Sequence, residues 1–312
     1  MLTEKYGKAV KGLGGLYNIR IEENGSVTYL SCKAKGSLHR DEEKLLIGDN
    51  VKVLIDEDTP DGVMVSEILT RKNSLIRPPL ANLDYIFVVF AAAKPAPVTE
   101  TVDKLIAIAE YNKIIPVVII TKSDLECENA DKLLAVYKKA GFDAFICSSK
   151  DGEGISEIKE YVNEKVRDGV TAAFAGASGV GKSTLLNALF PNLALATAEI
   201  SKKIERGRHT TRHVELYPLS ESCGCGFIAD TPGFSLLDFA RFDFFPIDSL
   251  ESTFREFASY RGKCRYADCA HFGEGRDDCA VIKAVEEGKI SESRHISYKE
   301  IYRTLKAKKS YE

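Results

Sequence analysis

The chain has 312 residues, enough for two or three domains with cores of their own. Its apolar share of 44%, charged share of 29% and formal net charge of −3 are ordinary for a globular protein and exclude a polycation. No segment approaches the roughly 18 consecutive apolar residues of a membrane helix. MLTEKYGKAV also lacks a signal-peptide core, so we expect a cytoplasmic protein. Its eight cysteines then favour metal ligation or simple burial over disulfides.

The first 70 or so residues differ in pattern from the rest of the chain. The stretches GLYNIRIEENGSVTYLSCKAKGSL and LLIGDNVKVLIDE show alternating apolar and polar residues, NG and GD turn signals and no helical spacing. About five short strands in this length predict a small β-barrel, with the oligonucleotide-binding type favoured. A structural β-domain without a ligand fits the same pattern.

From Asp84 onward, strands alternate with helices. Runs typical of buried strands occupy residues 85–92, 115–121, 142–149 and 171–176, with helical spacing at 102–113, 131–141 and 155–166. This alternation predicts an α/β fold with a parallel sheet covered by helices. The prolines of RPPLAN, at 77–82, predict a linker in front of it.

The firmest motif is the phosphate loop GASGVGKS. Gly176, Gly181, Lys182 and Ser183 fit G-x-x-x-x-G-K-[ST], between a predicted strand (TAAFA) and a predicted helix (STLLNALF). The glycines let backbone N–H groups surround a phosphate, while Lys182 can reach the outer phosphates and the Ser183 hydroxyl can ligate magnesium. The helix N-terminus then also faces the phosphates.

Two further segments follow in the order that a GTPase requires. GFIADTPGF predicts a strand ending at Asp230, which can hold the magnesium shell through water, and the Gly233 N–H can sense the terminal phosphate. RGRHTTRH lies between these motifs and is long enough to cover a nucleotide. Within it we choose Thr211 as the threonine that reaches magnesium, with Thr210 as the alternative. Taken alone, this stretch also fits a basic surface loop.

The base-reading segments lie upstream of the phosphate loop. TKSD at 121–124 matches the guanine-reading tetrapeptide of GTPases, usually Asn-Lys-X-Asp. In that motif the Asp124 carboxylate would accept two hydrogen bonds from guanine, with the stem of Lys122 along the base. SSK at 148–150 follows another predicted strand and fits the loop that contacts guanine O6. Because the phosphate loop comes first in an ordinary GTPase, we predict that this domain is circularly permuted.

The predicted nucleotide-binding residues therefore come from several loops. They are Thr121, Lys122, Ser123, Asp124, Ser148, Ser149, Lys150, Gly176, Ala177, Ser178, Gly179, Val180, Gly181, Lys182, Ser183, Thr184, Asp230 and Gly233, with Ser183 and Thr211 as magnesium ligands.

TKSD, SSKDGEGI, GASGVGKSTLLN, GRHTT, DTPGF and the cysteines from Cys264 onward together resemble the bacterial GTPases that depend on the small ribosomal subunit. The resemblance spans essentially the whole chain. It implies a barrel at 1–72, a permuted GTPase domain at 73–238 and a helical zinc-binding domain at 239–312. It also implies weak intrinsic GTP hydrolysis that the small ribosomal subunit stimulates, by a protein that acts in late assembly of the 30S subunit. We expect the partners to be the 30S subunit and its 16S rRNA, and the protein to be a monomer.

The sequence departs from the family pattern at two positions. Thr121 stands where Asn is usual, and we expect it to be too short to bridge as Asn does. Arg212 stands where a third Thr is common.

Cys264, Cys269, His271 and Cys279 form a candidate zinc site. They place three thiols and one imidazole in the short polar segment KCRYADCAHFGEGRDDCAV, which lacks core material of its own. Zinc takes four tetrahedral N/S ligands and would supply folding free energy. Free buried thiols are the alternative. Cys223 and Cys225 lack two further ligands nearby, and Cys32, Cys127 and Cys147 do not cluster.

Catalysis has the weakest signal. Many GTPases carry a water-orienting Gln just after DxxG, but this chain has Phe234 there. We take His209, in the loop expected to cover the phosphates, as the internal candidate, next to Thr211 and Lys182. A phosphate or rRNA contact is the equal alternative for His209.

Two other functions fit the sequence less well. An RNA-binding scaffold with a vestigial nucleotide site would not require intact Lys182, Ser183 and Asp230. A P-loop ATPase or small-molecule kinase would not use TKSD, because adenine cannot satisfy the Asp124 carboxylate. The segment after DTPG also runs straight into the cysteine region, so we expect the phosphate-sensing loop to tether that region.

Overall fold

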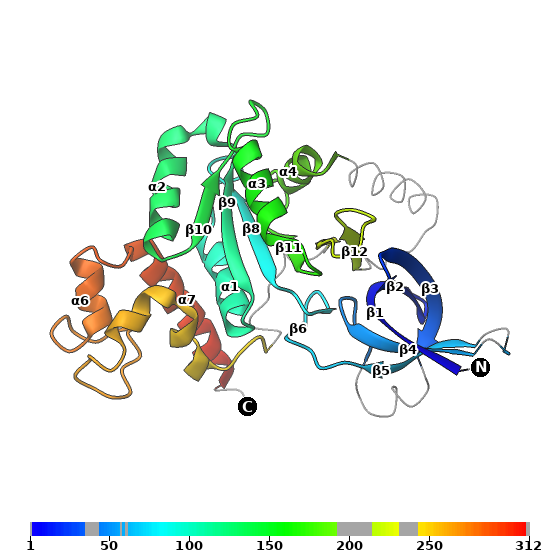
Figure 1. The fold of residues 1–312 in the computed structure, drawn as a ribbon. Coiled ribbons are helices and arrows are strands. Elements are labelled where there is room, and N and C mark those ends of the chain that lie inside the picture. Colours follow the sequence, from blue (N-terminus) through cyan, green and yellow to red (C-terminus); the bar gives the residue numbers. More distant parts are fainter. Residues whose placement is uncertain are drawn as a thin grey trace. The chain divides into compact units, whose positions relative to one another are not determined.

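The computed structural model describes residues 2–34, 44–56, 58–59, 62–191, 214–230 and 243–309 (Figure 1). Within it the chain forms two compact units. The first unit comprises Met1–Tyr85, Glu157–Phe174 and Leu186–Phe234, and the second comprises Ile86–Ser156, Ala175–Leu185 and Ser235–Glu312. Each is described by itself below.

A five-stranded barrel begins the first unit. Its strands are β1 (Leu2–Leu13), β2 (Leu16–Glu23), β3 (Ser26–Ala34), β4 (Asn50–Asp56) and β5 (Val63–Ile68). Antiparallel pairs join β2 to β1 and β3, and β4 to β1 and β5, while a parallel β3–β5 pair closes the ring. The tight turn at Asn24-Gly25 has positive φ at both residues, as the NG signal predicts. This topology confirms the barrel of oligonucleotide-binding type.

The barrel core follows from the alternation of apolar residues along its strands. Fully buried aliphatic side chains on β2, β4 and β5 point inward and pack together; they include Ile19, Ile21, Val51, Val53 and Val65. Their partners along each strand face outward, so one period-2 pattern encodes both the strands and their core.

Residues 77–82 do not form the expected linker. Strands β6 (Ser74–Leu75) and β7 (Leu80–Ala81) pair as a small antiparallel hairpin. Leu80, Ala81 and Leu83 are fully buried, and the buried Asn82 side chain donates to the Gly48 carbonyl at 3.0 Å. The prolines therefore lie in the turn of a packed hairpin, because the flanking apolar residues contribute to the core of this unit.

The first unit continues into three more strands. They are β11 (Thr171–Ala175), β12 (Glu215–Pro218) and β13 (Phe227–Asp230). β13 pairs parallel with β11 and antiparallel with β12. β12 in turn pairs with β1, and there the Lys11 Nζ lies 2.9 Å from the Glu215 Oε1. The barrel strands and these three strands therefore belong to one hydrogen-bonded sheet. Helix α3 (Ile155–Lys165) follows the SSK loop in the chain and α4 (Lys182–Leu189) follows the phosphate loop, and each helix has residues in both units.

The second unit contains β8 (Tyr85–Ala91), β9 (Ile115–Thr121) and β10 (Asp143–Ile146), with helices α1 (Thr99–Tyr111) and α2 (Cys127–Lys139). β9 and β10 are parallel, as predicted. Val88, Val118 and Ile119 are almost fully buried, which explains why these strands read as continuous apolar runs. The described part of the sheet with its helices confirms the α/β fold.

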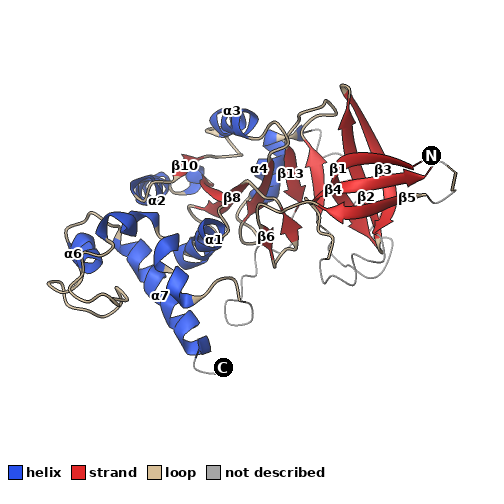
Figure 2. Cartoon of the chain, turned by 60° about the horizontal axis from the view of Figure 1, so that its bottom comes forward, coloured by secondary structure: helices blue, strands red, loops and turns tan. Residues whose placement is uncertain are grey.

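After Asp243, the regular secondary structure of the described residues is helical, and loops connect the helices (Figure 2). It forms the 3₁₀ turns η2 (Ile247–Ser249), η3 (Glu251–Thr253) and η4 (Arg255–Tyr260), then α6 (Ala280–Glu286) and α7 (Glu292–Lys309). α7 packs on α1 and joins it through the buried ion pair of Arg294 and Asp103. No helix among the described residues has the length and apolar content to cross a membrane.

Candidate nucleotide site and metal centre

The phosphate loop follows β11 and ends at the first turn of α4. A Cβ added at Gly176 would lie 2.1 Å from the Val89 carbonyl oxygen, so only glycine fits this close approach to β8. Gly179 and Gly181 have φ of 79° and 95°, which a side chain would strain. The loop that the motif predicts is thus built from three backbone requirements for glycine, and it leads into the N-terminus of α4.

Thr121 and Lys122 join the base-reading loop to this phosphate loop. The Thr121 hydroxyl lies 2.5 Å from the Val180 carbonyl oxygen and 3.2 Å from that of Phe90. Lys122, in the left-handed conformation, donates from its Nζ to the Gly179 carbonyl at 2.7 Å. Although shorter than Asn, the Thr121 side chain therefore reaches the phosphate loop, because that loop comes close enough for its hydroxyl.

The second base loop meets the first at Asp124. The buried Ser148 hydroxyl lies 2.9 Å from the Asp124 Oδ1 and 3.2 Å from the Asp151 Oδ2, and it accepts from the Asp151 N–H at 3.2 Å. Ser123 N–H also donates to the Cys147 carbonyl at 3.3 Å. TKSD and SSK thus form one connected corner, in which hydrogen bonding fixes the position of the Asp124 carboxylate.

The remaining predicted residues differ in exposure. Ala177, Ser178, Ser183 and Thr184 are exposed along the phosphate loop and the start of α4, and Lys182 is partly buried. In the second base loop, Ser149 is partly buried and Lys150 exposed. Asp230 is the last residue of β13. The proposed roles of His209, Thr211 and Gly233, and the alternative at Thr210, concern residues outside those that the structure describes.

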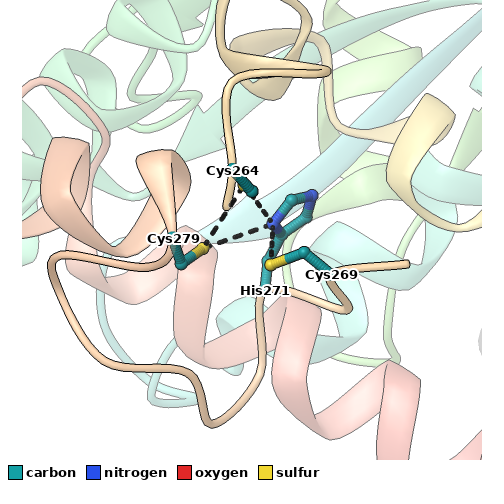
Figure 3. A group of neighbouring side chains, drawn as sticks. All are labelled: Cys264, Cys269, His271 and Cys279. Atoms are coloured by element: carbon teal, nitrogen blue, oxygen red, sulfur yellow. Dashed lines mark hydrogen bonds between the residues drawn. The ribbon is translucent and has the colours of Figure 1, made fainter. Parts of the chain in front are cut away.

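Cys264, Cys269, His271 and Cys279 converge on one point (Figure 3). Their ligand atoms all lie within 4.8 Å of one another. The His271 Nδ1 is 3.3 Å from the sulfurs of Cys269 and Cys279 and 3.6 Å from that of Cys264. The sulfurs of Cys264 and Cys279 are 3.9 Å apart. A tetrahedral zinc ion would set about 3.6 Å between nitrogen and sulfur and about 3.8 Å between sulfurs. The four residues fit such an ion.

The surroundings of these thiols also suit a cation. Burial raises the pKa of the Cys269 and Cys279 thiols, so the apolar site alone disfavours thiolates. The Ala280 N–H donates to the Cys264 sulfur, and the Ile282 N–H donates to the Cys279 sulfur, which caps α6. A bound metal would stabilise the thiolates that burial opposes.

Side chains of α7 hold the metal loop in place. The His295 Nε2 lies 2.7 Å from the His271 carbonyl oxygen, and the Tyr298 hydroxyl donates to the Ala270 carbonyl at 3.0 Å. The Glu274 carboxylate accepts from the N–H groups of Ala270 and Phe272. Sequence reasoning missed these supports, because His295 and Tyr298 lie 24 and 28 residues from the residues that they contact and no local motif marks them.

The other cysteines lie outside this group. Cys32, Cys147 and Cys225 are buried singly, Cys127 is exposed at the start of α2, and Cys223 donates to the Ser26 carbonyl. Among the described residues, the group of side chains that could hold a metal includes only the other three cysteines. This agrees with the prediction that these five do not cluster.

A phosphate loop bonded to a base loop that precedes it in the chain defines a circularly permuted P-loop GTPase. The family model for the RsgA GTPase matches residues 68–240, and that for the RsgA N-terminal domain matches residues 6–63. The chain belongs to the RsgA GTPase family, which confirms the family resemblance seen in the sequence, and it is a GTP hydrolase.

Relatives and solved structures agree over nearly the full length. The small ribosomal subunit biogenesis GTPases RsgA of Caldanaerobacter subterraneus and Agathobacter rectalis are 41% and 39% identical. The alignments cover 97% of this chain and 96% of the first relative, and 98% and 99% for the second. The crystal structure of YjeQ from Thermotoga maritima matches with a TM-score of 0.78 at 30% identity, covering 97% of this chain and 99% of that one. That of YloQ, described as a circularly permuted GTPase, matches with a TM-score of 0.77 at 30% identity, over 98% and 96%.

Proposed function

We propose that this GTPase binds the small ribosomal subunit and acts in late 30S maturation. The subunit stimulates hydrolysis, and the bound nucleotide controls binding and release. The observation that carries this proposal is the full-length similarity to relatives named for small-subunit biogenesis. The side-chain links between the base and phosphate loops support an intact nucleotide site, which a vestigial site on an RNA-binding scaffold would not require.

In the proposed site, Asp124 reads guanine and Lys122 lies along the base, with SSK closing the other side. Ser148 supports this assignment because its hydroxyl lies within hydrogen-bond distance of the Asp124 Oδ1 and can orient the carboxylate, whose remaining lone pairs can accept the two hydrogen bonds from guanine. Lys182 would contact the outer phosphates and the exposed Ser183 hydroxyl would ligate magnesium, which shields phosphate charge during transfer. Thr211, His209, Asp230 and Gly233 complete the proposed machinery from the sequence.

The proposed cofactors are one structural zinc ion and magnesium bound with GTP. Zinc suits the three thiols and one imidazole of the metal centre, since it forms tetrahedral sites with sulfur and nitrogen ligands. The segment from Cys264 to Cys279 has no helix or strand of its own, and the short α6 follows it. A bound ion would hold this segment together.

The proposed binding partner within the 30S subunit is its 16S rRNA, and we propose that the protein binds it as a cytoplasmic monomer. The proposed domain division is 1–72, 73–238 and 239–312, and the phosphate-sensing loop would tether the last part. A change at Gly233 on loss of the terminal phosphate would then alter how the zinc domain meets rRNA. This tether predicts tighter 30S binding with a non-hydrolysable GTP analogue than with GDP.

One set of measurements tests the proposal. Hydrolysis of GTP and XTP by the wild type and by Asp124→Asn is measured with and without purified 30S subunits, with Asp131→Asn, an exposed α2 carboxylate, as the matched control. We expect 30S-stimulated GTP turnover in the wild type and control, and a shift toward XTP in Asp124→Asn, because the amide complements the xanthine carbonyl. Pelleting with 30S in the two nucleotide states tests the tether. Turnover that 30S subunits do not change would contradict the assigned partner.

A further inference from the structure

His271 faces two different groups with its two ring nitrogens. Its Nδ1 points into the three thiols, at 3.3 to 3.6 Å, and its Nε2 lies 3.7 Å from the Glu251 Oε1. The imidazole is almost completely buried, with 4% of its side chain exposed, whereas the Glu251 side chain is 35% exposed. One face of the ring is therefore committed to the metal ligands and the other to a carboxylate.

Metal binding through Nδ1 would determine which ring nitrogen carries the proton. A neutral imidazole has one N–H, and a nitrogen that binds a metal must be free of hydrogen. If Nδ1 is the ligand, the hydrogen is on Nε2 and points toward Glu251. Carboxylates in this position orient metal-bound histidines and increase their basicity.

Both residues are held in place from other directions. Glu251 begins η3, and the Arg261 Nε lies 3.3 Å from its Oε1 while the Arg261 Nη2 donates to its backbone carbonyl at 3.3 Å. The His271 carbonyl is fixed by His295, and the ring of Phe257 meets the imidazole edge-on at 5.9 Å. These contacts keep the imidazole and the carboxylate facing each other, and the 3.7 Å separation exceeds a typical N–H···O distance by only about 0.8 Å.

We propose that Glu251 is the positioning residue of the metal centre, which fixes the His271 tautomer and ring orientation for metal binding through Nδ1. Arg261 places the Glu251 carboxylate for this role. The inference rests on the zinc centre of the proposed function. Glu251 lies in η3, before the segment that carries the four metal ligands, and the spacing of those ligands in the sequence does not point to it.

The test uses the full-length protein loaded with zinc. The zinc dissociation constant is measured by competition with a chromophoric chelator for the wild type, Glu251→Gln and Glu251→Ala. Glu286→Gln is the matched control, because Glu286 is an exposed carboxylate of the same region that pairs with Arg276. We expect Glu251→Ala to bind zinc about 10- to 100-fold more weakly, Glu251→Gln to fall between it and the wild type, and the control to match the wild type.

Two further readouts separate positioning from general folding. The absorption spectrum of the cobalt-substituted protein should retain its thiolate bands in Glu251→Gln with a shift in the ligand-field region, and the thermal stability of the metal-free protein should be unchanged. If Glu251→Ala is unstable without metal, Glu251→Gln alone decides. A wild type that holds zinc while both Glu251 variants bind it within twofold of the wild type would overturn the inference. A wild type that holds no zinc would overturn the proposed metal centre itself.

Discussion

Replacing Arg294 with Met should strongly destabilise the second unit. The Arg294 side chain is 1% exposed; its Nη1 is 2.6 Å from the Asp103 Oδ1 and its Nε is 2.7 Å from the Glu256 Oε1. The guanidinium also lies 4.5 Å from the centre of the Phe254 ring. The variant keeps much of the apolar stem but leaves two buried carboxylates without their cation. This group joins α1, η4 and α7, so its loss should separate the metal region from the sheet.

The expected magnitude follows from the buried ion pairs. Removing one partner of a buried ion pair costs about 3–5 kcal/mol of stability. Arg294→Met leaves two buried carboxylates unpaired, so we expect a loss toward the upper end of this range. For a unit of this size, the midpoint of thermal unfolding should fall by on the order of 10 °C. Arg303→Met is the control, because Arg303 lies on the same helix with its side chain 55% exposed. Its loss should cost less than about 1 kcal/mol.

The same variant has a predictable pH dependence. Burial raises the pKa of Asp103, and Arg294 counteracts this. Without Arg294 the pKa of Asp103 rises further, so the folded variant binds a proton that the unfolded chain has already lost. Its free energy of unfolding should therefore fall as pH increases above the unfolded pKa of about 3.9, with the deficit smallest in mild acid.

Urea unfolding and hydrogen exchange of α1 and α7 measure both effects. A loss below about 1 kcal/mol at pH 7, with unchanged exchange in both helices, would refute the reasoning.

The remaining predictions concern both units. Burial lowers the pKa of Lys8 to about 8, so the contribution of Lys8 to the free energy of unfolding should rise between pH 8 and about 10.4. The difference in this free energy between the wild type and Lys8→Met, measured in urea titrations, should therefore increase by up to about 3 kcal/mol across this window, and a constant difference would contradict the shift. Lys182→Ala should lower GTP turnover at least about 100-fold, with unchanged circular dichroism and zinc content; near-normal turnover would contradict the phosphate-loop assignment. Thr121→Val should weaken GTP binding about tenfold in calorimetry, because the buried Val180 carbonyl loses its donor, and unchanged affinity would show that the link is dispensable.

Much of the fold could be predicted because local patterns and tertiary structure agree. The run IPVVIIT was predicted as a strand at 115–121, and β9 has these bounds; the backbone turns at Lys113, two residues before the strand begins, and at Lys122, directly after it. The glycines of the phosphate loop were readable because the backbone there tolerates no side chain. In both cases the requirement is expressed by consecutive residues.

What could not be predicted depends on partners distant in sequence. β12 is only four residues long, and it is a strand because β1 and β13 supply its hydrogen bonds on two sides. The RPPLAN stretch looked like a linker because nothing local shows that Leu80 and Ala81 are buried. Glu251 was missed for the same reason, since its relation to His271 exists only in the folded chain.

The geometry of the base site explains how a permuted order leaves a GTPase site intact. β9 and β10 are parallel, so the loops that follow them lie at one sheet edge whatever their order in the chain. The phosphate loop is then attached to this edge by the side chains of Thr121 and Lys122. Because hydrogen bonds rather than chain continuity connect the loops, the chain after DTPG need not continue within the GTPase domain. It can lead into the helices of the metal centre, and α7 returns to α1 through Arg294 and Asp103. The metal region accordingly belongs to the same compact unit as the base and phosphate loops.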